Sequence, residues 1–283
     1  MTGQGKQAGD GSKDPSISIY SRLRRKLARG LAALSPSKRR MKKDWLSRAG
    51  VEFLRVAGIG KGDAIIDFGC GPGSYSIPAA SLVGSSGLVV SVDVRPKVLS
   101  RLTRRASARG LGNIRAAQRL EEAAYLLNGR SCRAVLLYDV LHFMDADTRK
   151  GLYRAFHERL GPGGFLSVFP KHLAGDSPSR FFRDLTVEDV SKEICESGFR
   201  LCGRLEADLW HNPGRERGTV LTFGKANGET PELVKASAPD AGQSEGRGMG
   251  RRALHFRAAD DCPRPQTGLK RGLCDMEQAL RQT

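Results

Sequence analysis

The sequence predicts an α/β fold built on a doubly wound, mostly parallel sheet. Residues 64–68 are a short apolar run of the kind found in strands buried on both faces, and a glycine-rich turn follows them. Residues 87–94 repeat the pattern and end next to an acidic side chain. The last two strand patterns, 199–205 and 218–224, have no helix between them, which predicts an antiparallel pair closing the sheet.

The remaining elements are predicted from helical or strand-like apolar spacing. A basic helix over 18–34 is followed by a proline- and charge-containing segment, 35–40, that predicts a hinge. Further helices are expected over 42–56, 74–83, 95–106, 145–160 and 186–198, and further strands over 113–118, 134–138 and 165–169. With the strands above, this gives seven strands. The loop between the last two contains Trp210 and His211.

The turn after the first strand is the most informative segment. Gly69, Gly71 and Gly73 stand at alternate positions and let a ligand lie directly against the backbone. The helix that follows places its N-terminus beside this turn, as in nucleotide sites. The dinucleotide fingerprint G-x-G-x-x-G fails, however, because Ser74 follows Gly73 and the third glycine comes one residue early.

An acid two residues before G-x-G-x-G, here Asp67, resembles motif I of the class I S-adenosylmethionine-dependent methyltransferases. Other landmarks occur in that family's order: Asp93, which lies 20 residues after Gly73, the segment 139–142, and Leu-Gly-Pro-Gly-Gly over 160–164. The resemblance covers about residues 42–225. It implies a Rossmann-like, doubly wound seven-stranded sheet with a C-terminal antiparallel strand pair.

The resemblance also implies S-adenosylmethionine as the cofactor and assigns residues to it. In the family the glycine loop wraps the methionine part, and the acid corresponding to Asp67 helps to hold the amino group. The spacing places Asp93 where doubly wound folds bind ribose hydroxyls. The acid that the family uses for adenine after the third strand is not evident here. The expected cofactor-binding residues are Asp67, Gly69, Cys70, Gly71, Gly73, Asp93, Val94 and Tyr138.

The acceptor is expected at the exits of the fourth and fifth strands. Asp139 and His142 are the candidate catalytic residues, because a titratable group there can take a proton from the nucleophile. Both also have structural interpretations: Asp139 can cap the backbone, and His142 can be a half-buried, hydrogen-bonded histidine. His172 is a further candidate for substrate contact.

Cysteine usage and hydropathy limit the classes of protein. The six cysteines contain no C-x-x-C pair, which favours free thiols in a reducing compartment, and no metal site is expected. They are not gathered as an arsenic-methylating enzyme would require. No apolar run approaches the ~18 residues of a membrane-spanning helix, so a cytoplasmic protein without a transmembrane segment is expected.

The net charge of +17 is concentrated near the N-terminus. Residues 1–50 hold 13 Lys and Arg against 3 acids. Three units are therefore expected: a basic, partly disordered arm over 1–40, a methyltransferase domain over 41–225 and a disordered tail over 226–283. Residues 20–43 can contact RNA or an anionic membrane surface, cap the cofactor pocket, or simply pack their leucines on the core.

The sequence therefore predicts a methyltransferase that acts on a small-molecule acceptor. It lacks the N/D-P-P-Y/F/W tetrapeptide of enzymes that methylate amino groups of bases, and the Pro-Cys pair of cysteine-dependent cytosine enzymes. Two alternatives remain open. One is an RNA-modifying methyltransferase that uses the basic arm, and the other is a non-catalytic protein that binds the cofactor.

Overall fold

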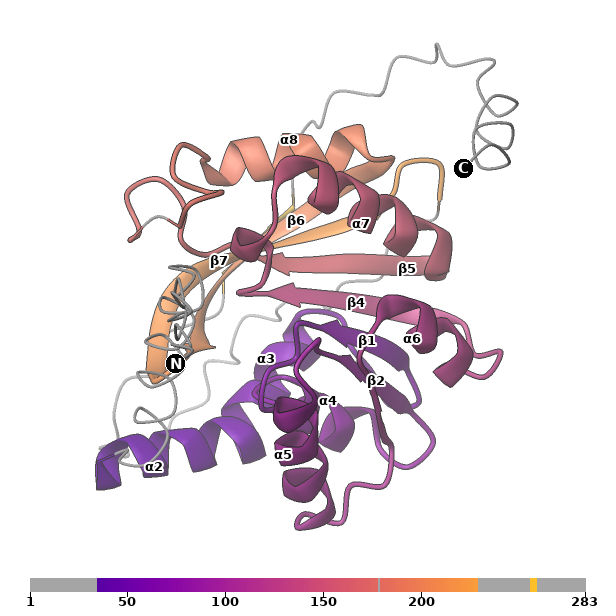
Figure 1. Cartoon of the computed structure of the whole chain (residues 1–283), viewed down its shortest axis with the longest axis vertical. Helices are drawn as coiled ribbons and strands as arrows, with labels where there is room; N and C mark the ends of the chain where they lie inside the picture. Colours follow the sequence, from indigo (N-terminus) through magenta and orange to yellow (C-terminus); the bar gives the residue numbers. More distant parts are fainter. Residues whose placement is uncertain (1–34, 178, 229–254, 259–283) are drawn as a thin grey trace, which may run out of the picture.

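The computed structural model describes residues 35–177, 179–228 and 255–258. They form an eight-stranded sheet in the order β3-β2-β1-β4-β5-β7-β6-β8, with helices on both faces (Figure 1). The predicted helix over 18–34 and most of the predicted tail lie outside the described residues. Among the described helices, none combines the length and the apolar character that crossing a membrane requires.

Five strands pair in parallel and three strands complete the sheet in antiparallel pairs. The parallel strands are β1 (Ala64–Phe68), β2 (Leu88–Val92), β3 (Ile114–Ala117), β4 (Cys132–Tyr138) and β5 (Leu160–Phe169). The antiparallel part contains β6 (Phe199–His211), β7 (Gly214–Lys225) and β8 (His255–Ala258). The predicted α/β class, with a mostly parallel sheet and an antiparallel pair, is confirmed, and β8 is an additional strand that the sequence analysis does not predict.

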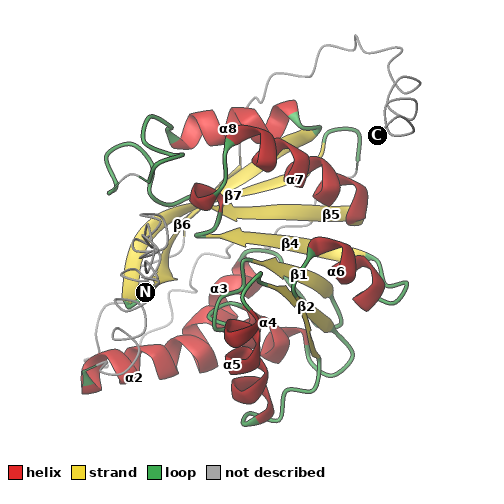
Figure 2. Ribbon diagram, viewed as in Figure 1, coloured by secondary structure: helices red, strands yellow, loops and turns green. Residues whose placement is uncertain are grey.

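The helices divide between the two faces of the sheet (Figure 2). Side chains alternate along a strand, so Ile65 joins one apolar core and Ile66 joins the other. The first core is covered by the π-helical turn η1 (Trp45–Ala49), α3 (Gly50–Val56), α4 (Ser76–Val83) and α5 (Pro96–Ser107), whereas α2 (Pro36–Asp44), which precedes η1, contributes no residue to it. The second is covered by α6 (Leu120–Leu126), the 3-10 turn η2 (Leu141–Phe143), α7 (Ala146–Arg159) and α8 (Val187–Glu196).

Two local predictions are wrong. The expected hinge over 35–40 is the start of α2, because the Ser35 hydroxyl accepts the Lys38 backbone N–H and Pro36 occupies the first turn, where its missing N–H has no cost. Trp210 and His211 belong to β6 and not to a loop, since the β6–β7 hairpin stays paired up to His211 and Gly214. The domain boundary near residue 41 stays a prediction.

The order of the strands in the sheet determines where a ligand site is expected. From β1 the chain first adds β2 and β3 on one side and then β4 and β5 on the other, so the strand order reverses between β1 and β4. Loops leaving the carboxyl ends of these two strands diverge to opposite faces and leave room for a ligand between them. Figure 1 shows the arrowheads of β4 and β5 at the same edge of the sheet.

A buried ion pair holds the segment that leaves β4. Arg149 of α7 makes two hydrogen bonds to Glu193 of α8, at 2.8 and 2.6 Å, and both side chains are largely buried. The same guanidinium donates to the Met144 carbonyl at 2.7 Å, just after η2. The position of η2 therefore depends on the packing of α7 against α8.

We expect Glu193→Ala to lower the free energy of unfolding by about 3–5 kcal/mol, because it leaves the Arg149 guanidinium buried without its partner. Glu196→Ala, an exposed site on the same helix, should change it by about 0.5 kcal/mol or less. The double variant Arg149→Met/Glu193→Leu should recover much of the loss, since no unpaired charge remains. Urea unfolding measures all three. Equal effects of Glu193→Ala and Glu196→Ala would contradict this account.

Candidate active site

The glycine loop lies between β1 and α4 at the carboxyl edge of the sheet. Gly69, Gly71 and Gly73 have φ angles of 74°, 52° and 87°, a region that side chains other than glycine rarely occupy. A Cβ at Gly69 would lie 2.3 Å from Val140, and one at Gly73 would lie 2.3 Å from Leu102. At Gly71 the nearest atom would be 4.0 Å away, so the middle of the loop faces open space.

Asp67 is fully buried at the end of β1. Its carboxylate accepts a hydrogen bond from the Ser76 hydroxyl, which in turn accepts one from Ser91 at 3.0 Å. The pKa of Asp67 is raised from its ordinary value of 3.8 to about 6. Burial is the main cause, the hydrogen bond from Ser76 opposes the shift, and the charge of Asp93 contributes to it. At neutral pH the buried Asp67 carboxylate is therefore negatively charged, and its hydrogen bonds replace only part of the hydration that it loses.

Asp93 follows β2 and contacts the same loop. One carboxylate oxygen accepts the Gly71 N–H at 3.1 Å, and both oxygens pair with Arg95, whose Nη2 lies 2.9 Å away. The carboxylate is buried, but the Arg95 side chain that covers it is more than half exposed and can move aside. Val94, between the two, is 77% exposed and offers an apolar surface beside the predicted ribose position.

Two other predicted cofactor residues are less available to a ligand. Cys70 is buried within the loop, and burial raises the pKa of its thiol, so it does not act as a thiolate. Tyr138 packs edge-on against Tyr75, and its hydroxyl is hydrogen-bonded to Ser167 at 2.7 Å. Any contact of Tyr138 with the cofactor would thus involve its backbone.

The N-terminal part of the described chain also reaches the glycine loop. In α2, Lys42 donates to the Ser74 hydroxyl at 3.0 Å, and the Trp45 indole N–H donates to the Ser74 carbonyl at 2.8 Å. Burial lowers the pKa of Lys42 to about 8, and two nearby arginines add to the effect. The sequence does not single out Lys42, because its contact with Ser74, 32 residues further along the chain, is visible only in the fold.

A second group of polar side chains gathers around Asp139 at the exits of β4 and β5 and the end of β6. Asp139 itself has a φ of 57°, uncommon for a residue with a side chain. The His211 Nδ1 donates to its carboxylate at 2.8 Å, while the His142 Nδ1 and the His172 Nε2 lie 3.6 and 3.8 Å from it. We call these four residues the Asp139 cluster.

The members of the Asp139 cluster differ in protonation. Burial lowers the pKa of His142 to about 4, so this ring is neutral at neutral pH. The hydrogen bond to Asp139 raises the pKa of His211 instead. Next to the cluster, Lys171 pairs with Asp176 and with Glu216, so its charge is compensated. The structure thus brings together three candidate residues, Asp139, His142 and His172, and adds His211, which the sequence analysis assigned to a loop.

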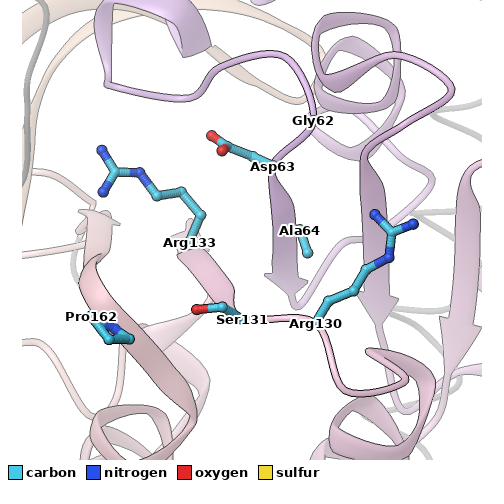
Figure 3. A pocket seen from close by; sticks show the side chains of 7 residues that line it. All are labelled: Gly62, Asp63, Ala64, Arg130, Ser131, Arg133 and Pro162. Atoms are coloured by element: carbon cyan, nitrogen blue, oxygen red, sulfur yellow. The ribbon is translucent and has the colours of Figure 1, made fainter.

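A separate pocket of about 340 Å³ opens at the opposite edge of the sheet, where β1 and β4 begin (Figure 3). Asp63, Arg130 and Arg133 line it, among other residues. Ligands of open α/β sheets bind outside the carboxyl ends of the strands. We therefore do not identify this pocket with the active site.

The region around the glycine loop is similar to known methyltransferases. Residues 65–164 match a family model described as a methyltransferase domain. The chain is 39% identical over 75 residues to aklanonic acid methyltransferase DauC of Streptomyces sp. (strain C5), and 52% identical over 40 residues to ribosomal RNA large subunit methyltransferase E of Desulfotalea psychrophila. These matches cover 24% and 14% of this chain and only 34% and 20% of the two relatives.

Among solved structures, the chain resembles a SAM dependent methyltransferase from Aquifex aeolicus. The alignment has a TM-score of 0.50 at 15% identity and covers 68% of this chain and 98% of the other. At this identity the likeness concerns the fold. The curated relatives include enzymes named for a small molecule and for RNA, so they do not specify the acceptor.

We expect Asp67→Asn to stabilise the cofactor-free protein at neutral pH. The native state holds a proton on Asp67 up to about pH 6, whereas the unfolded chain releases it near 3.8, so stability falls as the pH rises through this interval. The full effect above pH 6 is at most about 3 kcal/mol. The gain in melting temperature should therefore be larger at pH 7.5 than at pH 4.5.

The exposed variant Asp184→Asn is the control for this measurement, since it removes the same charge from a solvated position. A gain for Asp67→Asn that is the same at both pH values would contradict the assignment of a destabilising buried charge.

Proposed function

We propose that the chain contains a class I, S-adenosylmethionine-dependent methyltransferase domain and that the protein is an active enzyme that methylates a small-molecule acceptor. The observation that carries the proposal is the position of the open glycine loop. It lies at the carboxyl edge of β1, beside the exit of β4 where Asp139 begins the polar cluster. A cofactor site and a group of proton-accepting side chains thus share one edge of the sheet.

The residues of the loop fit the proposed cofactor. Gly71 leaves free the space that a Cβ would fill, and its N–H already contacts Asp93. We propose that the methionine part lies over Gly71 and that Asp93 accepts the ribose hydroxyls after Arg95 moves aside. Asp67 would supply negative charge below the amino group, and Lys42 would supply positive charge beside the carboxylate.

S-adenosylmethionine supplies a methyl group that is already electrophilic because it is attached to a sulfonium. The chain then has to align the nucleophile, exclude water and take up a proton where the nucleophile carries one. We propose Asp139 and His142 as the residues of this acceptor side, with His211 holding the Asp139 carboxylate. His142 is neutral and buried, so it can accept a hydrogen bond from the acceptor, but the burial that lowers its pKa to about 4 makes it a weak base.

RNA is the second candidate acceptor, and α2 is the observation that favours it. Apart from Lys42 and Asp44, which are partly buried, the side chains of this helix are exposed, its first turn has no acidic residue, and it carries Lys38, Arg40 and Lys43. A basic helix of this kind can bind phosphates without reading sequence. We rank RNA below a small molecule because the sequence lacks the base-methylation tetrapeptide.

We expect Gly71→Ala to lower the affinity for S-adenosylmethionine by about tenfold or more, because the methyl group enters the space proposed for the ligand. Gly110→Ala is a matched control: it has a φ of 68° and nothing within 4 Å of the added Cβ. Both variants should lose about 1–2 kcal/mol of stability from the left-handed backbone. Calorimetric titration and thermal unfolding measure the two effects, and equal affinities for both variants would refute the loop assignment.

The acceptor class can be tested by methyl transfer from tritium-labelled cofactor into a cell extract. We expect label in the small-molecule fraction, and much less of it after the Gly71→Ala change when the cofactor is below its saturating concentration. Label in RNA that is lost at high salt and in the triple variant Lys38→Ala/Arg40→Ala/Lys43→Ala would identify RNA as the acceptor. Cofactor binding without transfer to any fraction would indicate a non-catalytic binding protein.

A further inference from the structure

We propose that Asp139, His142 and His172 bind one divalent transition-metal ion at the carboxyl edge of the sheet, with His211 as a positioning residue. The sequence analysis expects no metal, since it considers only the scattered cysteines. The chain has five histidines, and three of them lie around one carboxylate. Two imidazoles and one carboxylate form a ligand set typical of iron, zinc and related ions, and they leave coordination positions open.

The distances suit a single ion after a small contraction. One ligand atom from each of the three residues lies within 4.8 Å of the other two. The Asp139 Oδ1 is 3.6 Å from the His142 Nδ1 and 3.8 Å from the His172 Nε2. An ion held about 2.0–2.2 Å from each atom needs these two Asp139–histidine separations to be only a few tenths of an ångström shorter, and the two histidine nitrogens to lie closer than the 4.8 Å limit of the set.

Two of the proposed ligand atoms have no other partner. The Asp139 Oδ1 and the His142 Nδ1 are both inaccessible to solvent and accept or donate no hydrogen bond within the described part of the chain. His142 is 93% buried, since 7% of its surface is exposed. Buried polar atoms without a partner are rare and costly in folded proteins. A cation between these two atoms would satisfy both.

The neighbouring contacts hold the other atoms in the orientation that metal ligands need. The His172 Nδ1–H donates to the Ser177 carbonyl at 3.0 Å, which leaves the Nε2 lone pair facing Asp139. The His211 Nδ1–H donates to the second oxygen of Asp139 and leaves Oδ1 for the ion. A backbone carbonyl behind a histidine and a histidine behind a carboxylate are common outer contacts of metal centres.

The surrounding charges permit a cation here. Lys171 is the nearby positive side chain, and its ammonium contacts both Asp176 and Glu216. Glu216 also lies 3.8 Å from the His211 Nδ1, so it adds negative charge on the outer side of the cluster. These two carboxylates compensate the lysine charge in part, although that charge still contributes to lowering the pKa of His142.

A role for the ion follows if the proposed function holds, and this step rests on it. A metal with open positions binds an acceptor through a hydroxyl oxygen and makes that hydroxyl more acidic. With Asp139 Oδ1 and His142 Nδ1 bound to the ion, these two side chains would no longer take the proton. The hydroxyl proton would then leave to solvent, the oxygen would form a bond to the methyl carbon, and the carbon–sulfur bond would break with its electron pair remaining on sulfur. This chemistry favours acceptors with a hydroxyl group next to a second oxygen donor.

Metal binding is tested on the untagged, full-length protein after treatment with a chelator. We expect calorimetric titration with Zn²⁺ alone to show one site, and Zn²⁺ to raise the melting temperature. His142→Ala and His172→Ala should each weaken binding at least 100-fold and remove the thermal shift. His211→Ala should weaken it 10–100-fold, as expected for an outer contact. His157→Ala, a histidine that packs on Phe199 away from the cluster, is the control and should bind as the unaltered chain does.

The result that overturns the proposal is the absence of a Zn²⁺ site in the unaltered protein, or equal binding by His172→Ala and His157→Ala. Thermal unfolding without metal shows whether each variant is folded, and His172→Ala provides a second test if the buried His142→Ala variant is not. Because the titration contains neither cofactor nor acceptor, its outcome is independent of methyl transfer. A protein that binds Zn²⁺ but transfers no methyl group would refute the proposed function and keep the metal site.

Discussion

The parallel alignment of β1, β2, β4 and β5 is the constraint on which the rest of the structure depends. Parallel strands end at one edge, so every residue that follows a strand arrives at the same place. The glycine loop, Asp93 and Asp139 follow three different strands. They are far apart in the sequence but lie at the same edge of the sheet. The hydrophobic cores on the two faces hold the strands in register, and the site itself contributes little to this.

Among the residues of the candidate site, Asp67 is the one whose buried charge most reduces the stability of the fold. A carboxylate that is 2% exposed at the end of a central strand receives one side-chain hydrogen bond, from Ser76, and no side-chain cation. An asparagine would fill the same space with less loss of solvation. The retained charge therefore has no explanation in the stability of the fold, and it agrees with the proposed position of a cationic amino group above the loop.

The fold and the cofactor half of the site were largely predictable, because their signals are local. Gly69, Gly71 and Gly73 are specified by backbone angles, and the strand before them by its apolar run. The predictions of local structure were wrong where tertiary contacts determine whether a segment is a helix, a strand or a loop. Pro36 suggested a hinge, yet the helix it starts packs at the loop through Lys42, and β6 extends to His211 because β7 pairs with it.

The acceptor half differs because its parts come from distant segments. His211 lies 72 residues from Asp139, and no spacing rule connects an end of the last hairpin to the exit of β4. A lone histidine in a sequence is uninformative, since it is most often a satisfied structural residue. Three of them around a carboxylate with unpaired buried atoms are informative, because packing gives no reason to gather them. In the proposed function, one short loop therefore determines which cofactor binds. The acceptor is selected by side chains such as His211, which the antiparallel strands bring next to Asp139.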